Sequence, residues 1–341
     1  MSRLPLTNFG YKMSCGQLGI NCEGHTMAVE QLGFSKICES GYYLASAGLD
    51  KLVVLRHGDT GDWVGTLTGH EAGVWSVTLN DEATMMASGS ADRTARIWCA
   101  ITGDELVKFT LPEAVTCVDL NEKSTCMVAG CLGVDPVINL FDLNGADWKP
   151  LLSLKGHSRG VRDAIFCRND FSLLTSSYDR TVRMWDCVSG LETHSIVLPH
   201  HAKSLELHAD NDIVTIAYGN SIIFVDTNNF EILSQRRMDF KVTGATLHPK
   251  KESFVCITGD GRLNKYDYVT DALLDSFYAH KGEPICCVRY SPDGEVYASS
   301  SCSGEMMLWQ QTVGKKYGLW DCAMDPCSSE DADDEEEDSI S

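Results

Sequence analysis

Two stretches of the sequence carry a histidine, a hydroxyl residue, an aspartate and a tryptophan at identical spacing. In a hydrolase, the first three residue types would serve as base, nucleophile and orienting acid. An enzyme needs such a set once, whereas here it recurs. Repetition therefore argues against a catalytic site and favours a structural role. The residues are His70, Ser88, Asp92 and Trp98 in the first set, and His157, Thr175, Asp179 and Trp185 in the second.

Other chemistry finds little support in the sequence. Cys126 and Cys131, like Cys322 and Cys327, are isolated pairs without a neighbouring histidine, whereas a structural zinc site needs four converging ligands. No phosphate-binding GxxxxGK[ST] motif is present. We expect no catalytic residues, no metal and no cofactor.

The second of these two sets, from His157 to Trp185, lies within a run of three predicted strands. Apolar residues alternate from Val161 to Phe166, which is the period of a half-buried strand. Phe171–Ser177 and Thr181–Trp185 have the same character, and Tyr178-Asp179 forms a turn between them. A Gly-His pair opens this unit, and Trp185-Asp186 closes it.

The spacing of six residues from aspartate to tryptophan extends to weaker copies along the chain. The tryptophan-equivalent positions are 56, 98, 141, 185, 225, 266 and 309; the copy near Asn220 is one residue short, and Ser303 replaces the expected aspartate of the last copy. A Gly-His start, a Trp-Asp end and this period resemble the WD40 repeat, which forms one four-stranded propeller blade. The resemblance implies an all-β, seven-bladed WD40 β-propeller. It also implies that the two sets of histidine, hydroxyl residue, aspartate and tryptophan form buried hydrogen-bond relays, which satisfy polar groups between neighbouring strands.

The propeller is expected to occupy residues 13–324. By the same resemblance, a strand within Met13–Cys22 completes the last blade and closes the ring, which removes exposed sheet edges. We expect residues 1–12 to be a flexible leader. Residues 325–341 are expected to be a disordered acidic tail, since eight acids fall within the nine residues from Glu330 to Asp338.

Composition points to a reducing compartment and to protein partners. The chain has 341 residues, of which 43% are hydrophobic, and it has no apolar segment of signal-peptide length near its start. Most of the 15 cysteines fall in predicted strands, where a reduced cysteine behaves as a small hydrophobe. We expect a cytoplasmic and nuclear protein. Its net charge of −20 disfavours direct contact with nucleic-acid phosphates.

Strand alternation nominates a partner-binding face. If Val74 and Val161 face the blade core, Trp75 and Arg162 point toward the mouth of the central channel, and Tyr178 lies on the same face. Tryptophan, tyrosine and arginine are enriched in interface hot spots. Packing of Trp75 against the adjacent blade is an equally good interpretation. The alternative site is the edge near Tyr317 and Trp320.

Residues outside the repeat motif narrow the family. The segments HGDTGDW (57–63) and VGKKYGLW (313–320) look like the family of serine-threonine kinase receptor-associated proteins, also called unr-interacting proteins. The resemblance implies a non-catalytic adaptor of the survival motor neuron complex, which supports assembly of spliceosomal small nuclear ribonucleoproteins. It also implies an Unr-type RNA-binding protein and receptor-signalling proteins as partners. A WD-repeat subunit of a translation-initiation complex is the alternative.

Overall fold

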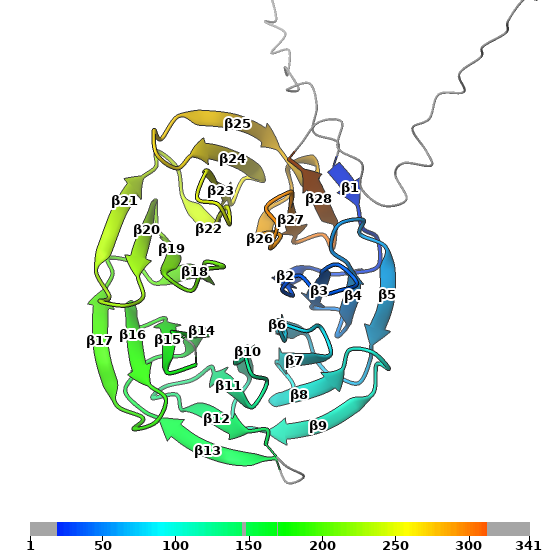
Figure 1. Ribbon diagram of the computed structural model, residues 1–341, viewed down its shortest axis with the longest axis vertical. Helices are drawn as coiled ribbons and strands as arrows, with labels where there is room; N and C mark the ends of the chain where they lie inside the picture. The colour runs from blue at the N-terminus through cyan, green and yellow to red at the C-terminus, as the bar shows by residue number, and fades with distance from the viewer. Residues whose placement is uncertain (1–18, 145–147, 169, 312–341) are drawn as a thin grey trace, which may run out of the picture.

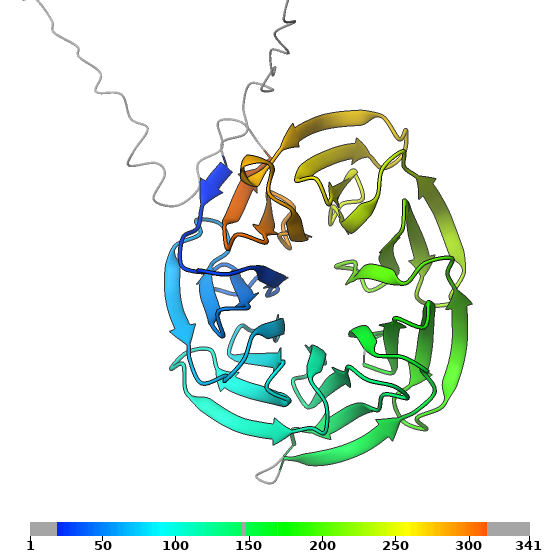
Figure 2. The same cartoon turned by 180° about the vertical axis from the view of Figure 1, so that it is seen from behind.

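The computed structural model describes residues 19–144, 148–168 and 170–311. The expected leader (1–12), the expected acidic tail (325–341), Tyr317 and Trp320 lie outside the described residues. Seven four-stranded antiparallel sheets are arranged as blades around a central axis (Figures 1 and 2).

Each blade takes four strands in chain order, from the innermost to the outermost, except the last. The blades are β2–β5 (Val29–Phe34, Tyr43–Gly48, Val53–His57, Trp63–Leu67), β6–β9 (Val74–Leu79, Met85–Ser90, Thr94–Cys99, Glu105–Thr110), β10–β13 (Val115–Leu120, Cys126–Cys131, Ile138–Asp142, Lys149–Leu154), β14–β17 (Val161–Cys167, Ser172–Ser177, Thr181–Asp186, Glu192–Val197), β18–β21 (Ala202–Leu207, Ile213–Tyr218, Ser221–Asp226, Ile232–Arg237), β22–β25 (Val242–Leu247, Ser253–Thr258, Arg262–Asp267, Leu273–Tyr278), and β26–β28 (Ile285–Tyr290, Val296–Ser301, Met306–Gln310) with β1 (Gly19–Asn21).

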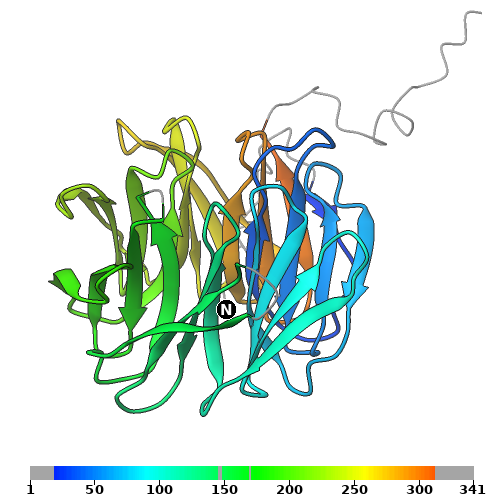
Figure 3. The same cartoon turned by 60° about the horizontal axis from the view of Figure 1, so that its bottom comes forward.

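The hydrophobic core lies between neighbouring blades. Val182 and Met184 of β16 pack in one cluster with Leu205 of β18 and Ile216 of β19, so the fourth and fifth blades share apolar surface. Second strands such as β15 are buried along their whole length, whereas the outer strand β17 is largely exposed. Because every sheet is covered on both faces except at its rim, each blade depends on its neighbours for burial (Figure 3).

The ring closes through β1, which is the outer strand of the last blade. Ile20 lies opposite Leu308, and the Cys22 N–H donates to the Met306 carbonyl at 2.8 Å. Segments from the two ends of the described chain therefore share one sheet, as Figure 1 shows. Of the predicted strand Met13–Cys22, the structure describes residues 19–22, and Gly19–Asn21 of these form β1, so the strand ends one residue earlier than predicted.

The predicted seven-bladed, all-β propeller is confirmed. Each of the seven tryptophan-equivalent positions is the next-to-last residue of the third strand in its blade. The fifth blade is one residue short because β19 and β20 are joined by Gly219-Asn220 alone, with Gly219 at a left-handed φ of 54°. One predicted strand boundary was wrong: Phe171 is 65% exposed and belongs to the turn before β15.

Regular helix is nearly absent from the part of the chain that the structure describes. Its single helical element is the 3₁₀ turn η1 (His280–Gly282). Across these same residues, no helix has the length and apolar character needed to span a bilayer.

Candidate protein-interaction site

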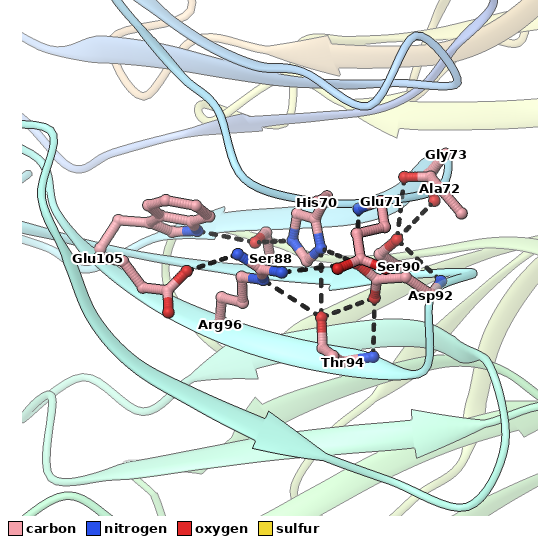
Figure 4. A network of polar contacts seen from close by, with 11 residues as sticks. His70, Glu71, Ala72, Gly73, Ser88, Ser90, Asp92, Thr94, Arg96 and Glu105 are labelled. Carbon is pink, nitrogen blue, oxygen red and sulfur yellow. Dashed lines mark hydrogen bonds and ion pairs between the residues drawn. The ribbon is translucent and has the colours of Figure 1, made fainter.

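The second blade contains a continuous hydrogen-bond relay (Figure 4). His70 Nδ1 lies 2.8 Å from an Asp92 carboxylate oxygen, and His70 Nε2 lies 2.7 Å from Ser88 Oγ. Trp98 Nε1 donates to the same Oγ at 2.8 Å. The geometry assigns the proton to Nδ1, which donates to Asp92, while Nε2 accepts from the serine hydroxyl.

The fourth blade repeats this relay. The contacts from His157 to Asp179, from His157 to Thr175 and from Trp185 to Thr175 are all 2.8 Å. Burial raises the pKa of Asp179, but hydrogen bonds from Thr181 and His157 outweigh it and hold this pKa at about 2. Burial lowers the pKa of His157, so its neutral form is favoured.

This arrangement is structural rather than nucleophilic. Ser88 is fully buried, and its oxygen is already engaged by His70 and Trp98. A hydroxyl in that position has no room for a substrate carbonyl, whereas it satisfies two buried nitrogen atoms. The relay joins the loop before the blade to its second and third strands.

Two further relays occur in degenerate copies of the repeat. In the first blade, His25 contacts Ser46 and Asp50 at 2.9 and 3.0 Å, and Arg56 lies over the Trp63 ring at 5.1 Å in place of the missing indole contact. In the last blade, His280 and Trp309 share Ser299 at 2.7 and 2.8 Å.

The serine of the last relay escaped the sequence analysis, although a signal was present. Ser299 stands ten residues before Trp309, as Ser88 does before Trp98. The acid of this relay is absent because Ser303 occupies its place, and Ser303 bonds Ser301 instead, at 2.9 Å. As a result, His280 Nδ1 is buried without a hydrogen-bond partner.

The feature that builds the channel mouth is a β-bulge in the innermost strand of every blade. The register shifts after the first residue of each of these strands, so one residue per blade is left out of the ladder and its side chain is redirected. The seven bulge residues are Glu30, Trp75, Thr116, Arg162, Lys203, Thr243 and Cys286.

Six of the seven bulge residues, all except Thr243, line a cavity of about 330 Å³, which we call the mouth cavity. Trp75, Arg162 and Tyr178, which the sequence nominated together, all line it and are each partly buried. The sequence did not nominate the other lining residues, although each bulge residue directly follows the first apolar residue of its strand. The remaining lining residues are Glu30, Gln31, Thr116, Leu132, Asp163, Lys203, Ser204, Gly244, Cys286, Cys287, Val288 and Arg289.

One side of the mouth cavity is basic. Burial lowers the pKa of Lys203, and the neighbouring charges of Arg162 and Lys241 lower it further. Among the described residues, neither Arg162 nor Lys203 has a carboxylate within ion-pair distance; Arg162 instead points its guanidinium at the Lys203 carbonyl, 3.3 Å away. Burial lowers the pKa of Arg162, but Tyr178, Asp163 and Glu30 raise it by more. Both cations still lack a direct carboxylate partner, so an outside anion can pair with them, in a chain of net charge −20.

The wall of the channel below the mouth contains buried charges that compensate one another. Arg289 Nε lies 3.9 Å from Glu206, and burial raises the pKa of Glu206 to about 7. Burial also raises the pKa of Asp163, partly offset by Arg289 and Arg162.

The opposite end of the channel differs from the mouth cavity because its polar side chains pair with one another. Lys36 Nζ lies 2.8 Å from Asp81 and 3.1 Å from Glu122, and Asn211 donates to Glu122 at 2.5 Å. These contacts join turns of four blades around a cavity of about 560 Å³.

The described residues include one grouping with metal-ligand chemistry, formed by His208, Asp210 and Asp212. Lys251 already neutralises part of its negative charge, since Lys251 Nζ lies 2.6 Å from Asp212 and 3.6 Å from Asp210. An ammonium group thus sits where a cation would bind.

Comparison with known proteins agrees with this architecture. The family described as "WD domain, G-beta repeat" matches residues 61–99, 148–186 and 272–310, which end in the three blades that carry Trp98, Trp185 and Trp309. The fold and the repeats define the class: this is a WD40 propeller, a scaffold for protein interactions.

The particular family follows from similarity over most of the chain. A Mus musculus protein named serine-threonine kinase receptor-associated protein is 40% identical over 312 residues, covering 92% of this chain and 88% of its own. A Dictyostelium discoideum protein of that name is 32% identical, covering 85% and 97%. The eukaryotic translation initiation factor 3 subunit I of Schizosaccharomyces pombe is 24% identical, covering 83% and 93%. The chain belongs to the serine-threonine kinase receptor-associated protein family.

Proposed function

We propose that this protein is a non-catalytic adaptor of the survival motor neuron complex, present in cytoplasm and nucleus, which supports assembly of spliceosomal small nuclear ribonucleoproteins. The family resemblance of the sequence motifs supports the choice of complex. The observation that supports an adaptor is the mouth cavity, where Trp75 and Tyr178 lie beside the unpaired cations Arg162 and Lys203. Aromatic and arginine side chains of this kind anchor protein interfaces.

The partner is expected to be protein rather than RNA. The lining of the cavity includes the acids Glu30 and Asp163 as well as the cations, and the whole chain has 48 acidic against 28 basic residues. A nucleic-acid interface needs a broad basic surface, because affinity grows with the number of phosphates neutralised. A partly buried arginine beside an exposed lysine suits an acidic side chain at the edge of a protein interface.

A charge reversal tests this assignment. Arg162→Glu should weaken capture of purified survival motor neuron complex subunits by about tenfold, because it places like charges against an acidic partner. Arg237→Glu, on the exposed outer strand β21, makes the same charge change away from the cavity and serves as the matched control. Tyr317→Ala tests the alternative edge. If none of these variants affects capture, the contact site lies elsewhere.

A receptor-signalling adaptor is the second candidate, and the name of the relatives, serine-threonine kinase receptor-associated protein, supports it. The same three variants should be assayed for capture of the cytoplasmic domain of a serine-threonine kinase receptor. Binding of that domain, with no capture of survival motor neuron subunits by the unmodified protein, would favour this second function. Tight, salt-sensitive binding of RNA by the purified protein would contradict both.

A further inference from the structure

Two cysteines are in contact at the edge of the mouth cavity. Cys286 is the bulge residue of β26, and Cys302 lies in the turn between β27 and β28. Their sulfur atoms are 3.2 Å apart. Cys302 is exposed and Cys286 is half-buried. Among the described cysteines, this is the one pair whose sulfur atoms are within hydrogen-bonding distance of each other.

The local backbone places the two side chains together. Ile285 pairs with Ser301 and Cys287 with Ser300, so Cys286 falls between these two pairs and faces the end of the hairpin. The Cys302 N–H donates to the Pro284 carbonyl at 3.0 Å, which holds the turn against the start of β26. A disulfide bond of about 2.05 Å therefore requires the sulfurs to approach by roughly one ångström.

We propose that Cys286 and Cys302 form a reversible dithiol–disulfide pair, a covalent modification site at the mouth cavity whose oxidant is a small disulfide such as glutathione disulfide. The Cys302 thiolate attacks one sulfur of glutathione disulfide and releases one glutathione. The Cys286 thiolate then attacks the Cys302 sulfur of the mixed disulfide and releases the second. The protein loses two electrons and two protons, and the small disulfide is reduced to two thiols.

The order of the two steps follows from exposure. Cys302 is exposed to solvent, whereas burial and the adjacent Cys302 thiol raise the pKa of Cys286, so a smaller fraction of Cys286 is thiolate. Contact with Cys302 compensates for this low thiolate fraction in the second step, because the attacking and attacked sulfurs are held together.

The consequence of oxidation is local to the binding surface. Cys286 lines the mouth cavity along with Trp75 and Arg162. The disulfide would tie the bulge residue of β26 to the turn and change that wall of the cavity without altering the sheet ladders. Formation of this disulfide does not depend on whether the proposed partners bind at the mouth cavity.

Peptide mapping tests the proposal on the full-length protein. Trypsin cleaves after Lys281 and Arg289, which places Cys286 in peptide 282–289 and Cys302 in peptide 290–315. After incubation of the reduced protein with glutathione disulfide and alkylation of free thiols, mass spectrometry should detect these peptides joined by a disulfide. Dithiothreitol should separate them.

Three variants identify the cysteines, since peptide 282–289 also contains Cys287. Cys286→Ser and Cys302→Ser should each abolish the joined peptides, whereas the matched control Cys287→Ser should retain them. Circular dichroism checks that each variant is folded, and the alanine substitution of the same cysteine replaces any serine variant that is not. Joined peptides that persist in Cys286→Ser would overturn the proposal. Stable glutathionylation of Cys302, without joined peptides in the unmodified protein, would overturn it equally.

Discussion

The Trp185 side chain contacts the second strand of its blade and the loop before the blade. Its indole is 2% exposed, donates to Thr175 and meets the His157 ring edge-on with centroids 6.0 Å apart. A Cβ atom at Gly156 would lie 3.0 Å from this indole, so the loop before the blade packs directly on it. The residue fills a space that no neighbour can enter without moving the relay.

Replacing Trp185 by alanine should lower the free energy of unfolding by about 3–5 kcal/mol, because a large buried side chain leaves a cavity. Chemical denaturation measures the loss. Trp63→Ala is the matched control: Trp63 is 51% exposed, and its removal should cost about 1 kcal/mol or less. Equal losses in the two variants would show that Trp185 is not a core residue.

His280 is the weak point among the relay histidines. Burial lowers its pKa to about 4, and the nearest acid, Glu305, lies 3.8 Å from Nδ1. Between about pH 4 and 6.5, the histidine is therefore protonated in the unfolded state, where its pKa is about 6.5, and neutral in the folded state. By linkage, stability is lost as the pH falls from about 6.5 toward 4.

Restoring the acid should repair this relay. Ser303→Asp gives His280 Nδ1 a partner, raises the pKa of His280 in the folded state, and should stabilise the protein by about 1–2 kcal/mol at pH 7. Denaturation at pH 7 and pH 5 should show a smaller loss for the variant than for the unmodified protein. Ser303→Asn is the uncharged control and should not flatten the pH profile. A destabilised Ser303→Asp variant with an unchanged profile would contradict this account.

The strands and the seven blades could be predicted from the sequence because the repeat period is recognisable in it. The Trp98 and Trp185 copies set the period, and hydrophobic alternation carried it through copies as degenerate as Val225. The bulges were not predictable, since an extra residue in one strand becomes visible only when its partner's register is known. For that reason the sequence nominated Trp75 and Arg162 but not Lys203 or Cys286.

A relay could be predicted in those repeats that contain all four of its residues, and was missed in the last repeat, where one residue is replaced. Ser303 broke the last copy, so the partnership of His280 with Ser299 required the structure. The mouth cavity combines residues from several blades, whose relative rotation is set by packing between sheets and not by any local pattern. The basic side of that cavity could not be predicted from the composition either, because acidic residues outnumber basic ones in the chain as a whole.

The ring-closing strand β1 is short, but we expect it to stabilise the whole propeller. β1 has three residues, yet it covers the outer edge of β28 and buries Ile20 against the last blade. Deleting residues 1–21 should lower the melting temperature by several degrees and promote self-association, because an unpaired strand edge is exposed. Thermal melting and sedimentation measure both effects. Deletion of residues 1–12 is the control and should change neither; if both deletions behave alike, closure through β1 does not stabilise the ring.

At the scale of the whole molecule, acid is concentrated at one end of the sequence. Nine acids lie from Asp325 onward, which leaves 39 acidic against 28 basic residues in the rest and a net charge of −11 there. Segment and body thus carry charge of the same sign. The run from Glu330 to Asp338 also contains one apolar residue, Ala332, so it has little surface to bury on the propeller.

Deleting residues 325–341 should therefore leave the melting temperature of the propeller within about one degree, since repulsion opposes docking and no apolar contact compensates for it. Differential scanning calorimetry at low and high salt measures this. A deletion that removes no contact leaves the melting temperature unchanged at both salt concentrations. The alternative is that the acids bind Arg162 and Lys203, the cations of the mouth cavity. In that case the deletion would lower the melting temperature by several degrees at low salt, and high salt would abolish the difference because it screens the attraction.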